Sequence, residues 1–122
     1  MKKMILFFIA TLFFTGISYS QINTDWKTVY TFSGSSNENT DDFVVKSNKW
    51  RIVWEANKQY QDVEGGNVFI ILKSSDGEED MIANTLPYNI GKSIIRKKGT
   101  FYFEVTCFLA KWKIEVQEYV NK

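Results

Sequence analysis

The stretch from Phe101 to Val116 reads FYFEVTCFLAKWKIEV, and it decides the fold. In both halves of the stretch apolar and polar side chains alternate with a period of two residues, the pattern of a half-buried β-strand. The apolar positions are Phe101, Phe103 and Val105 in the first half, then Trp112, Ile114 and Val116 in the second. The stretch therefore predicts two strands that each turn one face toward a hydrophobic core.

The same period recurs upstream of this stretch. One face is expected to carry Trp26, Thr28, Tyr30 and Phe32, another Phe43 and Val45, and a third Trp50, Ile52 and Trp54. About seven or eight short strands, separated by turn residues every eight to twelve positions, predict an all-β antiparallel sandwich that is jelly-roll-like. A closed barrel is the alternative, because the sequence does not fix the strand order.

Several segments need a separate interpretation. The run Val68–Leu72 is apolar at every position, which is typical of a central strand covered on both faces. The polar segment Gln59–Asn67 and the single proline, Pro87, mark the expected loops, and Asp76-Gly77 marks a turn. Asp80–Leu86 is the one stretch that could form a helical turn.

The first twenty residues have the layout of a secretory signal peptide. Lys2 and Lys3 precede an apolar run from Met4 to Phe14, and small residues lead to Ser20. The run is shorter than the roughly 20 residues that span a bilayer. We expect cleavage between Ser20 and Gln21, a signal peptide over 1–20 and a single domain over 21–122. The predicted location is the periplasm or the medium, without stable membrane insertion or a lipid anchor.

The charge balance and the cysteine content limit which partners the chain can bind and which disulfides it can form. The full chain has 15 Lys plus Arg and 14 Asp plus Glu, and loss of Lys2 and Lys3 leaves a net charge of −1. This balance gives no electrostatic case for nucleic acid. Cys107 is the sole cysteine, so no intramolecular disulfide can form. Beside Phe108 and Leu109 it is expected to be a buried small hydrophobe, with an intermolecular disulfide as the alternative.

Histidine is absent, which removes the commonest general base, the Ser-His and Cys-His pairs and most zinc sites. The adjacent carboxylates Asp41-Asp42 and Glu78-Glu79-Asp80 lie in predicted turns, where they are expected to be solvated rather than to face each other across a cleft. Calcium binding by the acidic run that begins at Asp76 is a weaker alternative. We expect no enzyme activity, no catalytic residue, no cofactor and no metal.

Aromatic side chains are the remaining candidates for recognition. Trp50, Trp54 and Trp112 are in phase with core positions, so packing explains them. Tyr102 is out of phase on its strand, and Tyr60 and Tyr88 fall in predicted loops. These three tyrosines are the candidate ligand contacts, because sugar rings stack on exposed aromatic rings. The cluster Arg96-Lys97-Lys98 is interpreted as a solvated turn.

The closing part of the chain resembles a known kind of domain. Gly99–Val105 (GTFYFEV), followed by Trp112–Val116 (WKIEV), looks like the final hairpin of small secreted bacterial β-sandwiches of the pre-peptidase C-terminal type. The segments Phe32-Ser33-Gly34 and Trp50–Trp54 follow the same order of elements. The resemblance implies a sandwich fold and an accessory binding role. The acidic strand motif of that type is missing after the first turn, and no functional residue can be carried over.

Taken together, these features predict an exported, non-catalytic binding module whose ligand is a glycan or a protein. The alternatives are a structural cell-envelope protein without a discrete ligand site, and a small secreted inhibitor or effector.

Overall fold

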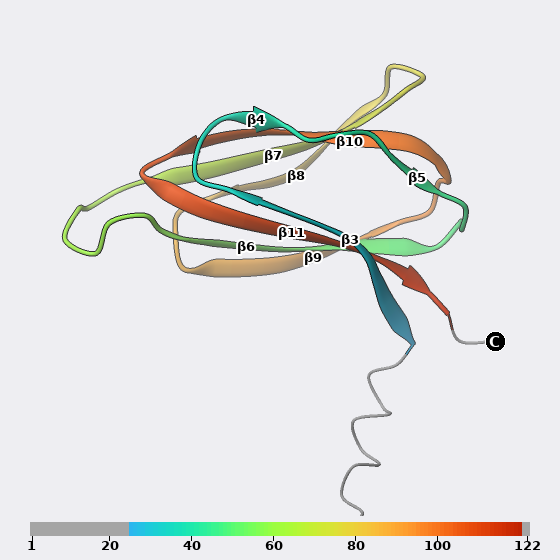
Figure 1. Cartoon of the computed structure of the whole chain (residues 1–122), viewed down its shortest axis with the longest axis horizontal. Helices are drawn as coiled ribbons and strands as arrows, with labels where there is room; N and C mark the ends of the chain where they lie inside the picture. The colour runs from blue at the N-terminus through green and yellow to red at the C-terminus, as the bar shows by residue number, and fades with distance from the viewer. Residues whose placement is uncertain (1–24, 121–122) are drawn as a thin grey trace, which may run out of the picture.

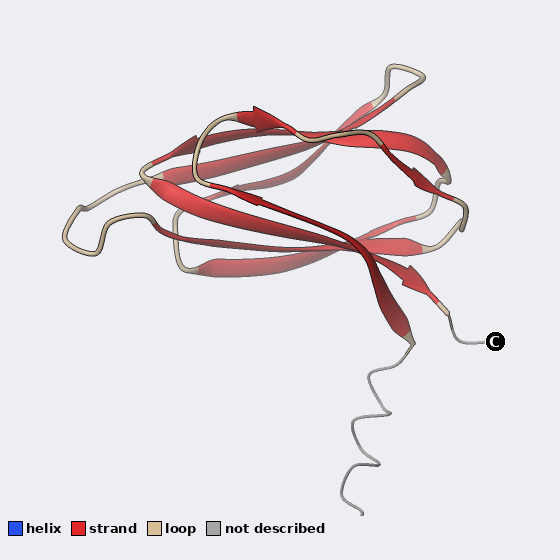
Figure 2. Ribbon diagram, in the orientation of Figure 1, coloured by secondary structure: helices blue, strands red, loops and turns tan. Residues whose placement is uncertain are grey.

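The computed structural model describes residues 25–120, so the predicted signal peptide over 1–20 lies outside the described residues. Every regular element in the described part is a β-strand (Figure 2). Labels follow Figure 1 and begin at β3. The strands are β3 (Trp26–Gly34), β4 (Glu38–Asn39), β5 (Phe43–Val45), β6 (Trp50–Lys58), β7 (Asn67–Ser74), β8 (Glu79–Thr85), β9 (Asn89–Ile95), β10 (Gly99–Phe108) and β11 (Ala110–Tyr119).

Two antiparallel sheets pack face to face (Figure 1). One sheet has the order β3-β11-β6-β9, and the other has the order β4-β10-β7-β8, with β5 also paired to β10. Apart from the β4–β5 link and the β7–β8 hairpin, each connection carries the chain from one sheet to the other. This is jelly-roll connectivity, which confirms the predicted antiparallel sandwich and excludes a closed barrel.

The core lies between the two sheets and is built by the alternation read from the sequence. Phe43, Trp50 and Phe103 are essentially inaccessible to solvent. The indole N–H of Trp50 donates to the backbone oxygen of Lys97 at 2.8 Å, so this large ring is buried with its polar group satisfied. Trp112 is also buried, and Trp54 is half-buried against the core. The prediction that packing explains these tryptophans is confirmed.

A single residue explains why β4 and β5 are separate strands. Between them, Thr40 is buried, and its backbone N–H donates to the Phe103 oxygen at 2.9 Å. Its hydroxyl in turn accepts a hydrogen bond from the Phe103 N–H, also at 2.9 Å. The threonine side chain thus takes the place of a ladder partner where the strand is interrupted.

One predicted face is wrong in β3. Tyr30 lies opposite Val116, but Thr28 lies opposite Gln117, so Val29 is an extra residue that forms a β-bulge. The bulge reverses the alternation. Tyr30 and Phe32 pack against the core, whereas Thr28 turns outward and donates to the Glu115 carboxylate at 3.0 Å.

Two further expectations are corrected in the other sheet. Asp80–Leu86 forms no helical turn, because residues Glu79–Thr85 pair with β7 as an edge strand. In β7, Val68, Ile70 and Leu72 are buried, whereas Phe69 and Ile71 on the opposite face are only half-buried. No described element covers that opposite face, so β7 is central within its sheet but is not covered on both sides.

Candidate functional site

The outer face of the five-stranded sheet carries side chains that no described element covers. Across β10, β7 and β8 the register forms rows of three residues. Tyr102, Lys73 and Glu79 form one row, and Glu104, Ile71 and Met81 form the next. A third row places Phe69 between Thr106 and Asn84. The face therefore carries charged side chains around the Tyr102 row and large apolar side chains, set among polar ones, toward Phe69.

The polar end is organised around Lys73. Its ammonium group lies 3.0 Å from a Glu104 carboxylate oxygen and 3.2 Å from one of Glu79. These hydrogen bonds, first to Glu104 and then to Glu79, raise the pKa of Lys73 above its ordinary value, so the side chain stays charged.

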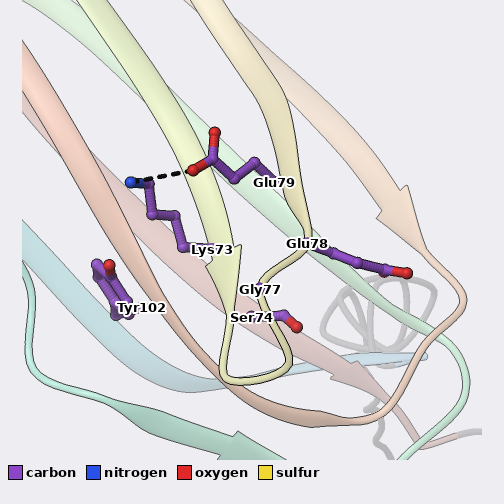
Figure 3. A pocket seen from close by; sticks show the side chains of 6 residues that line it. All are labelled: Lys73, Ser74, Gly77, Glu78, Glu79 and Tyr102. Atoms are coloured by element: carbon purple, nitrogen blue, oxygen red, sulfur yellow. Dashed lines mark ion pairs between the residues drawn. The ribbon is translucent and has the colours of Figure 1, made fainter.

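A small pocket of about 140 Å³ opens at this end. It is lined by Lys73, Ser74, Gly77, Glu78, Glu79 and Tyr102. Figure 3 shows the ion pair between Lys73 and Glu79 on the side of Tyr102, while the Glu78 side chain extends the other way. Pockets for drug-sized ligands measure roughly 300–1,000 Å³, so this one has room for a single small ring.

The apolar end exposes large side chains. Met81 is 66% exposed and Phe108, at the far end of β10, is 67% exposed. Between them lie the half-buried Phe69 and Ile71. The outward side chains of β10, β7 and β8 between Tyr102 and Phe108 are called the strip below. The strip is about 20 Å long, and across its three strands it is about 10 Å wide. Its area is far below the roughly 800 Å² that each partner contributes to a standard protein–protein interface.

The three predicted tyrosines do not form one site. Tyr102 lies on the strip, but Tyr60 and Tyr88 are at the end of the sandwich that bears the β6–β7, β8–β9 and β10–β11 connections. There the hydroxyl of Tyr88 donates to the Gln61 side chain at 3.2 Å, which joins the loops of Tyr60 and Tyr88. Both tyrosines are exposed.

The backbone at this end is locally strained. Tyr88 and Leu109 have φ angles of 65° and 54°, and they are the two non-glycine residues with positive φ among those described. Left-handed backbone is unfavourable for large side chains. Hydrogen bonds from the Tyr88 N–H to the Ala56 oxygen and from the Gln59 N–H to the Leu109 oxygen hold the two turns in place.

The acidic turn is engaged by Lys97. Its ammonium group lies 2.8 Å from an Asp76 carboxylate oxygen and also pairs with Glu78. Lys97 is therefore part of a clamp between two turns rather than a purely solvated charge. Lys97, then Ser74 and the Glu78 N–H lower the pKa of Asp76 to about 2. Among the described residues, no group of three or more His, Cys, Asp or Glu is placed to hold a metal ion.

Cys107 is partly buried and packs against the core. Its thiol donates to the Ala110 oxygen at 2.9 Å, and burial raises the pKa of the thiol above its ordinary value. The interpretation as a small packed hydrophobe fits this environment, although the side chain is not fully enclosed.

Sequence reasoning found Tyr102 but missed the residues around it. Lys73 and Glu79 face each other across the β7–β8 hairpin, whereas Tyr102 and Glu104 come from the distant strand β10, which only the β10-β7-β8 strand order places beside Lys73. Phe69 and Ile71 had a readable signal, because they alternate with the core positions of β7. The uniformly apolar run hid that signal, since it also fits a strand covered on both faces.

No protein-family model matches the chain, and no curated protein shows significant similarity to it. Within residues 25–120 there is no helix with the length and apolar character needed to cross a bilayer. The described chain is therefore classified by its architecture alone, as a small all-β domain of two packed sheets.

Proposed function

We propose that this protein is an exported, non-catalytic module that binds a glycan chain along the outer face of the five-stranded sheet. One observation carries the proposal. Tyr102, Phe69 and Phe108 follow one another along an uncovered strip, with the Lys73, Glu79 and Glu104 charges beside Tyr102.

The chemistry of the polar end suits a sugar. A pyranose has an apolar face of C–H bonds and a rim of hydroxyl groups. The C–H face packs on an aromatic ring such as that of Tyr102. Sugar hydroxyls donate to the carboxylates of Glu79 and Glu104, and the Lys73 ammonium donates to a hydroxyl oxygen.

The shape of the strip favours a linear ligand over a folded protein. It is long and narrow, and its area is too small for a standard protein interface. An extended peptide is also a poor fit, because the backbone groups of β7 already pair with β10 on one side and β8 on the other. A glycan chain needs only side-chain contacts, and the strip supplies those.

Export rests on the leader composition of residues 1–20, and the non-catalytic role rests on the absence of histidine. The resemblance of the closing hairpin to accessory secreted sandwiches agrees with both. N-terminal sequencing of protein recovered from the periplasm or the medium tests export, with Gln21 expected as the first residue. An intact Met1 on protein from the cytosol would contradict export.

The glycan proposal is tested with the mature chain on an array of bacterial and plant polysaccharides. The best hit is then titrated by calorimetry. Replacing Tyr102→Ala should weaken binding at least about tenfold, because the stacking surface is lost. Tyr102→Phe keeps the ring and should retain most of the affinity.

Tyr88→Ala is the matched control, because it removes an exposed tyrosine from the end of the sandwich and leaves the strip intact. Circular dichroism of each variant verifies folding. Failure of every polysaccharide to bind, or equal loss in the Tyr102→Ala and Tyr88→Ala variants, would refute the strip as a glycan site.

A further inference from the structure

The two sheets have four edges in the described chain, and each edge strand exposes unpaired backbone N–H and C=O groups. Such an edge can pair with another chain, so proteins commonly block it by making the strand short, by a bulge or by charges. The edges are β4 with β5, β8, β3 and β9.

Three of these edges are too short or are interrupted by a bulge. β4 has two residues and β5 has three, so neither offers a continuous ladder. β3 is interrupted by the bulge at Val29. β8 is interrupted as well, because Ile70 faces Ala83 and Ile71 faces Met81, which leaves Ile82 as an extra residue.

The fourth edge, β9, is regular. Its residues Asn89–Ile95 pair with β6 in an unbroken register, and the strand contains no proline. On its outer face Ile90 and Ile94 are 77% and 46% exposed, and Lys92 lies between them. An edge that is regular over seven residues can accept a further strand, and its single charge, Lys92, restricts which strands it accepts.

We propose that β9 binds an extended segment of another protein, which adds a fifth strand to the β3-β11-β6-β9 sheet. The segment carries an acidic residue opposite Lys92 and an apolar residue two positions to either side, opposite Ile90 and Ile94. Main-chain hydrogen bonds supply affinity, and the alternate side chains supply specificity. This goes beyond the glycan strip, which lies on the other sheet.

The charge of Lys92 determines which kind of strand binds to β9. In the part of the chain that the structure describes, Lys92 makes no ion pair. Two copies of this chain that paired all seven residues of β9 antiparallel would bring the lysines of both copies directly opposite each other. Like charges opposite each other destabilise a strand pair, whereas opposite charges stabilise it. In this fully paired register the edge therefore disfavours a second copy and favours an acidic partner strand.

The test uses two fluorescein-labelled peptides and the mature chain. One peptide is Thr-Val-Thr-Glu-Thr-Val-Thr, and the other has lysine in place of the central glutamate. Fluorescence anisotropy should show that the Glu peptide binds at least about tenfold more tightly, and Lys92→Glu should reverse the preference. Lys111→Glu makes the same charge change at an exposed position of β11, away from the edge, and should leave the preference unchanged.

Hydrogen exchange then locates the bound strand. The backbone N–H groups of β9 that point away from β6 should exchange more slowly in the complex, while those of β8 keep their rates. The proposal is overturned if neither peptide binds, if both bind equally, or if Lys92→Glu leaves the preference as it was. Sedimentation that shows a peptide-free dimer, abolished by Lys92→Glu, would also overturn it by assigning the edge to a second copy.

Discussion

Gly91 shows how one missing side chain lets a sheet edge pack tightly. A Cβ atom built at this position would lie 2.3 Å from Cζ2 of Trp54, whose indole covers the glycine. We expect Gly91→Ala to destabilise the domain by about 1–3 kcal/mol, because the half-buried indole has to shift. Urea unfolding followed by fluorescence measures the loss, and Ser93→Ala on the same face of β9 is the control. Equal midpoints for the two variants would contradict the predicted clash.

Asp76 makes the stability depend on pH in a defined direction. Its pKa is about 2 in the folded protein, against 3.8 for an unperturbed aspartate. A carboxylate whose pKa is lowered by folding stabilises the folded state above the higher value, and this contribution disappears as the pH falls through the lower one. We therefore expect Asp76→Asn to be less stable than the natural protein at pH 6. The difference should close between about pH 4 and pH 2.

Urea midpoints measured across this pH range test the Asp76 prediction. Lys97→Met removes the first cause of the pKa shift and should reproduce most of the effect. The double variant should add little to either single change, since both act on one ion pair. A stability difference that stays constant down to pH 2 would show that the clamp does not hold the carboxylate in its charged form.

At the scale of the element, β5 is short but carries a central part of the core. The ring of Phe43 lies 5.2 Å from that of Phe103 and 6.0 Å from that of Trp50, measured between centroids. We expect Phe43→Ala to cost about 3–5 kcal/mol in unfolding free energy, because it leaves a cavity in the core. Val44 is the next residue but points outward, so Val44→Ala should cost much less. Similar losses in chemical denaturation would contradict the assigned faces.

The strands show which parts of the fold a period of two can predict. For Phe101–Val105 and Trp112–Val116 the predicted core faces agree with the buried positions. Where one extra residue interrupts a strand, as at Val29, the alternating side chains switch faces beyond it, and no local signal in the sequence marks the position. Glu79–Thr85 could be recognised as a strand only through pairing with β7, because its own side chains are mostly polar.

The candidate site depends even more on pairing between distant strands. Tyr102 was predictable, because a large aromatic residue out of phase with the core has to lie on an outer face. Its neighbours Lys73 and Glu79 were not predictable, because the jelly-roll strand order decides which strand lies beside β10. The β9 edge has the same origin, since only the topology shows which strands lack a second neighbour.

At the scale of the whole molecule, the two sheets offer two different kinds of surface. The five-stranded sheet offers a face where side chains alone make contact, which suits the proposed glycan. The four-stranded sheet offers an edge where the backbone is open, which suits the proposed protein segment. A two-layer fold permits both at once, because the outer face of one sheet and the free edge of the other are separate surfaces.

The topology also sets the folding rate. β3 pairs with β11 from the far end of the chain, and β5 pairs with β10, so the core forms only after long loops close. Domains dominated by such pairings fold in milliseconds to seconds. We expect refolding from urea in this range by stopped-flow tryptophan fluorescence, with a rate that reductant does not change because Cys107 is the only cysteine. Refolding within microseconds would contradict a rate limited by distant strand pairing.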